Sequence, residues 1–111
     1  MRIQTQDYNE VTVVELQGDL ESEYTEQLKK TITELIGKNK KGIVLDMSAI
    51  GFIDGRGLEQ LLWSKDYCNE NKCGFRIAGL DENCLKILEL TRLEQEFERY
   101  AELAEAVKSF A

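Results

Sequence analysis

The chain of 111 residues contains no histidine, no proline and only three cysteines. Histidine is the usual general base, a frequent zinc ligand and the common partner of a nucleophilic serine or cysteine. Cys68, Cys73 and Cys84 are odd in number and lack CxxC spacing, which favours free thiols over disulfides or a sulfur-rich zinc site. We therefore expect a protein that is not an enzyme and that needs no cofactor and no metal.

Long apolar runs and an excess of positive charge are also missing. No segment approaches the roughly 18 to 20 consecutive apolar residues of a membrane span, and the first ten residues, MRIQTQDYNE, lack a signal-peptide core. Lysine and arginine number 14 against 21 acidic residues, which gives a net charge of −7. The only dense basic run, Lys38 to Lys41, is interpreted as a solvated turn. The composition predicts a cytoplasmic protein that inserts into no membrane and binds no nucleic acid.

The apolar pattern predicts one domain over residues 1–111 in which strands alternate with helices. No repeat, low-complexity run or flexible linker divides the chain. An antiparallel hairpin followed by crossover connections implies a mixed, mainly parallel sheet, so the expected fold class is an α/β sandwich. The expected elements are strands at 3–7 and 11–16, a helix at 22–37 with Ser22 as N-cap, a strand at 43–47, a helix at 57–71, a strand at 75–78, a helix capped by Asp81, a strand at 97–100 and a final helix with Leu103, Val107 and Phe110.

The segment from Ile43 to Leu58, IVLDMSAIGFIDGRGL, carries the most functional information. An apolar strand enters a glycine-rich turn that leads directly into a helix. The polar elbow before that helix consists of Asp54, Gly55, Arg56 and Gly57. A strand-to-helix elbow exposes backbone N–H groups and often carries a recognition site or a switch.

Four motifs in this order resemble those of a known family. They are GDL at Gly18 to Leu20, IVLDMS at Ile43 to Ser48, FIDGRGL at Phe52 to Leu58 and LKILELTRLEQEF at Leu85 to Phe97. With these motifs the sequence resembles, over nearly its whole length, the STAS domains, the family of anti-sigma factor antagonists. The resemblance implies a sheet of four or five strands with about four helices, mostly on one face. It also implies a protein-binding module of bacterial transcription regulation, which acts by partner switching.

The resemblance implies a phosphoacceptor that this sequence lacks. In phosphoregulated members the elbow resembles DSSG, and a partner kinase, also an anti-sigma factor, phosphorylates the second serine to end binding. Arg56 occupies that position and Gly55 the position before it, so neither residue has a hydroxyl. A phosphoserine brings about −1.5 to −2 charges to the helix N-terminus, whereas arginine brings a permanent positive charge. The sequence therefore predicts a fixed docking edge at the elbow in place of a phosphorylation switch.

The sequence leaves two interpretations of Arg56 open. Arg56 can reach back to Asp54, or forward to Glu59 or Gln60, and only satisfy the loop. Alternatively, Arg56 is a recognition group for a carboxylate on a partner, or for a phosphate on that partner.

The helix that follows the elbow predicts a contact surface. Glu59, Trp63, Tyr67 and Glu70 are spaced four, four and three apart, which places them in one stripe with Arg56 at its N-terminal end. This stripe is predicted to lie opposite the apolar arc that is expected to face the sheet, which consists of Leu58, Leu61, Leu62 and Cys68. Tryptophan and tyrosine beside arginine commonly anchor interfaces, although Trp63 can instead pack as peripheral core. The predicted partner-binding residues are Asp19, Asp54, Gly55, Arg56, Gly57, Glu59, Trp63 and Tyr67.

Acidic side chains and hydroxyls near the strand ends offer alternatives that we weigh as weaker. Asp19, Asp46 and Asp54 are predicted on the same side of the sheet, where paired acids can hold a metal or act as acid and base. Acids at strand ends more often cap loops. No hydroxyl is a convincing substitute phosphoacceptor, because structural roles are favoured for Ser48, Ser64 and Thr91.

The leading hypothesis is a non-catalytic module whose protein partner is an anti-sigma factor or serine kinase. An alternative is a subunit of a membrane complex, such as a transporter or a stress-sensing assembly. The different-class rival is a small-ligand or nucleotide sensor, which the absence of a P-loop and of GxGxxG disfavours. The sequence leaves a homodimer open.

Overall fold

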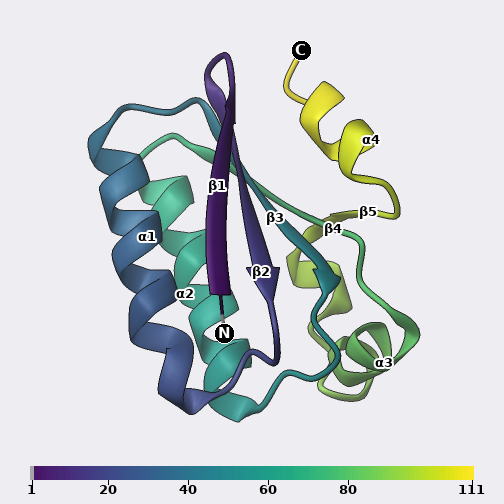
Figure 1. Cartoon of the computed structure of the whole chain (residues 1–111). Coiled ribbons are helices and arrows are strands. Elements are labelled where there is room, and N and C mark those ends of the chain that lie inside the picture. Colours follow the sequence, from purple (N-terminus) through teal and green to yellow (C-terminus); the bar gives the residue numbers. More distant parts are fainter. Residues whose placement is uncertain (1) are drawn as a thin grey trace.

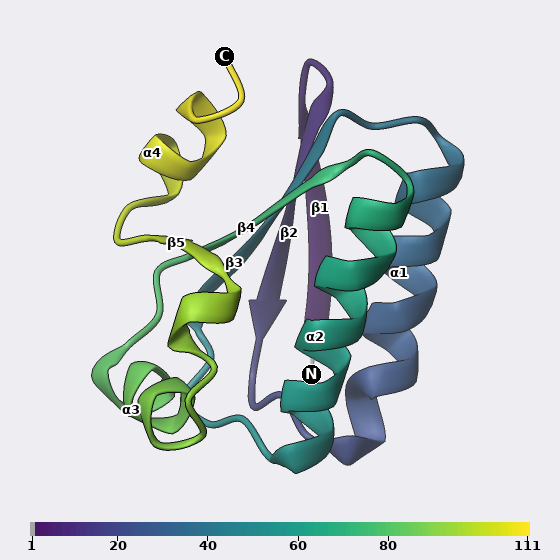
Figure 2. The same cartoon turned by 180° about the vertical axis from the view of Figure 1, so that it is seen from behind.

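The structure is a computed structural model that describes residues 2–111, and it is a five-stranded mixed sheet with helices on both faces (Figures 1 and 2). The strand order is β1-β2-β3-β4-β5, with β1 antiparallel to β2 and the other neighbours parallel. The α/β class with an N-terminal hairpin is as predicted. The elements are β1 (Arg2–Tyr8), β2 (Val11–Gln17), a 3-10 turn (Ser22–Tyr24), α1 (Thr25–Gly37), β3 (Gly42–Ala49), α2 (Gly55–Glu70), β4 (Gly74–Ala78), α3 (Glu82–Leu90), a second 3-10 turn (Glu94–Glu96), β5 (Glu98–Tyr100) and α4 (Leu103–Lys108).

The main core lies between the sheet and helices α1, α2 and α3. Alternate strand residues such as Val14, Ile43 and Ile77 point into it, and helix residues such as Leu28 and Leu61 meet them there. β3 begins with the apolar run Ile43 to Leu45, because it is central in the sheet and buried on both faces. The helices are therefore mostly on one face, as the family resemblance implied.

Helix α4 covers the opposite face of the sheet. A second, smaller apolar cluster there joins Ala106 of α4 to Val11, Val13 and Val44. The ring of Phe110 lies over the backbone of β3 and β4. It takes the place that a Cβ would need at Gly42 and Gly74, which are partners in neighbouring strands.

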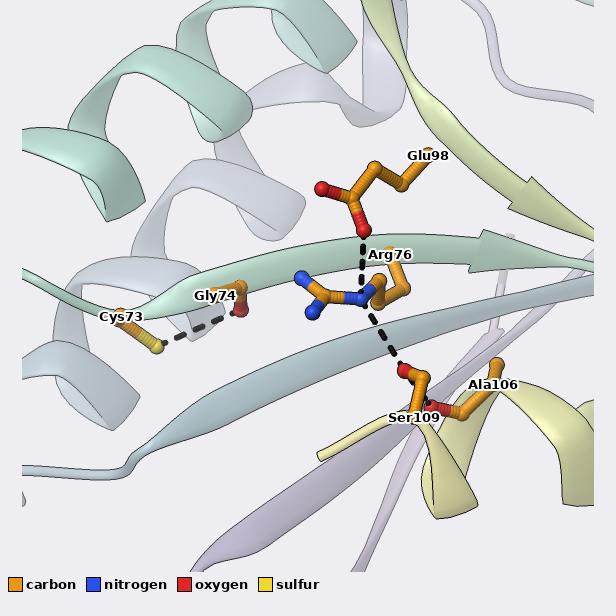
Figure 3. A network of polar contacts seen from close by, with 6 residues as sticks. All are labelled: Cys73, Gly74, Arg76, Glu98, Ala106 and Ser109. Atoms are coloured by element: carbon orange, nitrogen blue, oxygen red, sulfur yellow. Dashed lines mark hydrogen bonds and ion pairs between the residues drawn. The ribbon is translucent and has the colours of Figure 1, made fainter. Parts of the chain in front are cut away.

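Arg76 on β4 fixes the end of the chain to this face (Figure 3). Its Nε donates to Ser109 Oγ at 3.1 Å and pairs with Glu98 Oε2 at 2.9 Å. Its guanidinium carbon lies 4.1 Å from the centroid of the Phe110 ring. We refer to this contact of Arg76 with Glu98, Ser109 and Phe110 as the C-terminal clasp.

Two sequence-based predictions about local structure were wrong. Ser22 does not cap the first long helix, because a 3-10 turn begins there and α1 starts at Thr25, whose preceding residue makes no side-chain cap. Leu62, expected to face the sheet, is only half-buried at the margin of the core. Asp81 does cap its helix as predicted, accepting from Cys84 N at 2.8 Å.

Candidate functional site

The elbow is held against the loop that follows β2. Leu20 and Ile53 form an isolated parallel bridge, in which Leu20 N donates to Phe52 O at 2.9 Å and Asp54 N donates to Leu20 O at 3.1 Å. Both apolar side chains are buried. The chain therefore enters α2 from a short stretch of extended backbone that is anchored on both sides.

Asp54 is the residue that fixes the start of α2. One carboxylate oxygen accepts from Gly57 N at 2.8 Å, and the other accepts from Ser22 N at 2.9 Å and from Ser22 Oγ at 3.0 Å. The Gly57 N–H, followed by the Ser22 donors, lowers the pKa of the Asp54 carboxyl. Asp54 is thus an N-cap that also ties the elbow to a residue 32 positions earlier.

The two glycines that flank Arg56 have different environments. A Cβ on Gly57 would collide with the backbone oxygen of Leu20 and would lie 2.9 Å from a methyl group of Ile53. A Cβ on Gly55 would meet nothing within 4 Å. Gly57 is therefore required by close packing, whereas Gly55 is exposed and open to solvent.

Arg56 projects from the first turn of α2 and is exposed. Within residues 2–111, its side chain forms no salt bridge and no hydrogen bond with another side chain. In particular it does not pair with Asp54 or Glu59, the two carboxylates that the sequence offered as local partners. The structure thus leaves the positive charge of Arg56 available at the surface.

An open groove of about 510 Å³ runs between α1 and α2 beside Arg56. Trp63 stacks on Tyr67 with ring centroids 4.8 Å apart, and Lys29 Nζ of α1 lies 5.2 Å from the Trp63 ring. Both aromatic residues are half-buried against the core instead of fully exposed on the far arc of α2. The groove is lined by Thr25, Glu26, Lys29, Arg56, Glu59, Gln60 and Trp63.

Gln60 contributes an unsatisfied donor to this region. Its side chain is 8% exposed, and Nε2 is buried with no hydrogen-bond partner in residues 2–111. A buried N–H without an acceptor costs about 1 to 3 kcal/mol. Because Nε2 is enclosed, the groove does not present it to solvent.

The remaining predicted acids do not assemble a reaction centre. Asp46 accepts from Ser48 N and Oγ at 3.1 and 2.8 Å, which is the loop-capping role, and Asp19 is exposed beside Gly51. Over residues 2–111, no three or more acidic or cysteine side chains gather into a group that could hold a metal ion.

The other nucleophilic side chains are occupied or buried. Ser64 and Thr91 donate to backbone carbonyls one turn earlier in their helices. The three cysteines are free thiols and buried, and burial raises the pKa of Cys84 to about 12. The two hydroxyls are thus engaged within their own helices, and the three thiols lack the exposure of a reactive cysteine.

Two residues of this surface were not identified from the sequence. Ser22 belongs to it through its two hydrogen bonds to Asp54, and no local pattern connects residues so far apart in the chain. Phe52 lies just before the elbow and is 47% exposed. Phe52 lies in a loop between two buried isoleucines, where an apolar side chain belongs to no amphipathic helix or strand. This position was the sequence signal that could have indicated its exposure.

These features define a small α/β sandwich whose distinctive surface is a braced elbow at the start of a helix. The sequence model of the STAS domain matches residues 2–106. The chain belongs to the STAS domain family.

Solved structures agree with this assignment. An anti-sigma factor antagonist from Mycobacterium paratuberculosis has a TM-score of 0.87 at 22% identity, covering 98% of this chain and 92% of that chain. A putative anti-sigma factor antagonist from Thermotoga maritima has a TM-score of 0.89 at 19% identity, covering 97% and 93%. A sulfate transporter family protein from Wolinella succinogenes has a TM-score of 0.82 at 16% identity, covering 91% and 84%. At these identities the likeness establishes the fold.

The same fold thus occurs in proteins described as anti-sigma factor antagonists and in a protein of a transporter family. None of the helices in residues 2–111 has both the length and the hydropathy that crossing a bilayer requires.

Proposed function

We propose that this chain is a non-catalytic protein-interaction module of bacterial regulation that docks a partner protein on the surface around Arg56. One observation carries the proposal. Both oxygens of Asp54 are engaged in holding the elbow, while Arg56, two residues later, is exposed and unpaired within residues 2–111. A rigid frame that presents an uncompensated guanidinium suits recognition of a carboxylate, which arginine can bind through two parallel hydrogen bonds.

The groove beside Arg56 supports a protein partner. Half-buried Trp63 and Tyr67, which stack on each other, offer a rigid aromatic platform. Tryptophan, tyrosine and arginine are the residue types that most often dominate interface energies.

Charges around the groove restrict the partner further. Lys29 and Arg56 provide two positive charges, while Glu26 and Glu59 line the same groove with two negative ones. The chain as a whole carries −7, so a strongly acidic partner would be repelled except at this point. We infer a partner that places a single acidic side chain at Arg56 and neutral or basic groups around it.

Control by phosphorylation at the elbow is not part of the proposal, because neither Gly55 nor Arg56 has a hydroxyl. The hydroxyls of Ser48, Ser64 and Thr91 each donate to an acceptor in the fold. Incubation with ATP and the serine kinases of the native cell, followed by intact-mass measurement, should return the unmodified mass. Stoichiometric phosphorylation at any of these three residues would contradict a fixed docking edge.

Affinity capture from the native cell tests the surface itself. We expect Arg56→Glu and Trp63→Ala each to lose the partner that the unmodified protein retains, as measured by quantitative mass spectrometry. Lys86→Glu on the exposed side of α3 makes the same charge reversal away from the groove and should retain it. Retention of every partner by Arg56→Glu and Trp63→Ala would refute the assignment of this surface.

A second candidate is a subunit of a membrane-associated complex, which the fold shared with a sulfate transporter family protein favours. The docking surface would be the same and only the partner would differ. Capture of an integral membrane protein through Arg56 would favour this candidate. Capture of an anti-sigma factor or a serine kinase through Arg56 would favour control of transcription.

A further inference from the structure

Strand β1 forms an edge of the sheet whose outer side is uncovered. It pairs only with β2, through a continuous register from Arg2 opposite Gln17 to Tyr8 opposite Val11. All of its residues except Ile3 are exposed. No element crosses in front of β1 in Figure 1, where it is the nearest strand, and it lies farthest away in Figure 2.

The turn geometry identifies which backbone groups face outward. Tyr8 and Val11 are partners across a two-residue turn, so they must exchange hydrogen bonds with each other, because no wider pair fits inside the turn. Alternation then directs the N–H and C=O groups of every second residue toward β2. The backbone groups of Ile3, Thr5 and Asp7 are left pointing away from the sheet.

This edge lacks the features that usually prevent strand pairing. It contains no lysine and no proline, and no bulge interrupts its register with β2. Arg2 and Asp7 are its only charged residues, one of each sign, and isoleucine, threonine and tyrosine favour strands.

We propose that β1 is a homodimer contact, in which β1 of a second copy pairs antiparallel with it about a two-fold axis at Thr5. A two-fold axis perpendicular to the sheet leaves the α4 faces of both copies on the same side of the joined sheet. Residues that lie opposite each other across the contact therefore belong to the same face. Thr5 then lies opposite Thr5 of the second copy, and Ile3 lies opposite Asp7. Each of these three residues donates one backbone hydrogen bond and accepts one, so every outward group is satisfied.

The side chains in this register are compatible on both faces. On the α4 face, Arg2 lies opposite the exposed ring of Tyr8, which suits a cation–aromatic contact, and Gln4 lies opposite Gln6. On the other face, Asp7 is already engaged by Thr12 Oγ1 at 2.7 Å and by Lys40 Nζ at 3.4 Å. No like charges face each other across the axis.

Salt should strengthen this dimer. Each copy carries a net charge of −7, so repulsion between whole molecules opposes association at low ionic strength, while the contact itself is nearly neutral. Screening removes the repulsion without weakening backbone hydrogen bonds. The contact does not involve Arg56 or the groove, and it is therefore independent of the proposed function.

Sedimentation equilibrium at 0.15 M and 0.5 M salt tests the contact. We expect a reversible dimer that is tighter at the higher salt. Thr5→Lys places two like charges on the axis and should raise the dissociation constant at least about tenfold. Thr91→Lys makes the same change at the end of α3 and should leave it unaltered, with circular dichroism confirming that both variants are folded. A monomer throughout, or a dimer unaffected by Thr5→Lys, overturns the proposal.

Crosslinking gives a test that does not depend on affinity. The native cysteines are at most 2% exposed, so a short bismaleimide should react only with an introduced thiol. Thr5→Cys should give a covalent dimer, because the axis places its Cβ about 4.5 to 5.5 Å from that of the second copy. Thr91→Cys should remain monomeric. Failure of Thr5→Cys to crosslink in a sample that sedimentation shows to be dimeric would place the contact elsewhere.

Discussion

Arg76 on the α4 face and Arg56 at the elbow differ in what surrounds them. Arg76 is engaged by Glu98, Ser109 and the ring of Phe110, and its side chain is 17% exposed. Arg56 is exposed and forms no ion pair within residues 2–111. The same side chain thus contributes to folding in one place and is available for recognition in the other.

Glycine and aspartate show how the elbow can be rigid while its arginine is free. Gly57 packs its backbone against Leu20, and Asp54 holds the turn through three hydrogen bonds. The fold has therefore fixed the backbone on either side of Arg56 without using its guanidinium.

The largest effect on stability is expected from Gly57→Ala. The new Cβ would collide with the backbone oxygen of Leu20, which cannot move without breaking the Leu20–Ile53 bridge. We expect the free energy of unfolding to fall by about 2 to 3 kcal/mol. Urea denaturation followed by Trp63 fluorescence measures this change.

Gly55→Ala is the matched control for that variant. A Cβ at Gly55 has open space, and alanine restricts the unfolded chain, so the free energy of unfolding should be unchanged or rise by up to about 1 kcal/mol. Equal losses in both variants would show that close packing at Gly57 is not what fixes the elbow.

Asp54→Ala should have the next largest effect. It removes the cap of α2 together with both bonds to Ser22, and we expect a loss of about 1 to 2 kcal/mol in thermal or urea unfolding. Asp81→Ala removes a cap that accepts one hydrogen bond, from Cys84 N, and should cost less. A larger loss for Asp81→Ala would mean that the tie to Ser22 adds nothing.

The C-terminal clasp should give a smaller effect. Arg76→Ala removes the contacts with Glu98, Ser109 and Phe110, and we expect the free energy of unfolding to fall by about 1 kcal/mol. Hydrogen exchange of α4 should quicken. Arg56→Ala should leave stability unchanged or slightly raised, because a cation opposes the dipole at a helix N-terminus. Equal losses in the two variants would abolish the distinction between the arginines.

The smallest expected effect is a difference in acid stability between Asp54→Asn and the unmodified protein. The hydrogen bond from Gly57 N–H lowers the pKa of Asp54 from its ordinary value of 3.8. The stability that this carboxylate contributes is therefore fully present above about pH 4 and is lost as pH falls through the lowered value. The pKa of Asp7 is lowered as well, first by the Thr12 hydroxyl. The pH dependence of the unmodified protein therefore contains both carboxyls, and a variant at Asp54 is needed to separate them. The midpoint of urea unfolding should fall less between pH 5 and pH 3 in Asp54→Asn than in the unmodified protein.

Most of the fold could be predicted because its signals are local. The helical spacing of Leu28, Ile32 and Leu35 identifies α1 and its buried face. Val11 to Leu16 was identified as a strand, although β2 is buried on both faces and not on one. The parallel sheet follows from the lengths of the connections. The placement of Phe110 over Gly42 and Gly74 could not be predicted, because it joins residues far apart in the chain.

The candidate site was predictable only in part, for the same reason. The glycine-rich turn identified the elbow and its Arg56. The bond from Ser22 to Asp54 spans 32 residues, so no sequence period indicates it. The half-burial of Trp63 depends on where α1 lies beside α2, as the approach of Lys29 to its ring shows.

The most direct test of the account compares the affinity and the stability of one variant. With the captured partner purified, calorimetry should show that Arg56→Ala raises the dissociation constant by about 30-fold or more, as expected of a dominant interface residue. Its urea unfolding should remain within about 0.5 kcal/mol of the unmodified protein. An unchanged dissociation constant for Arg56→Ala would contradict the claim that the elbow presents Arg56 for recognition.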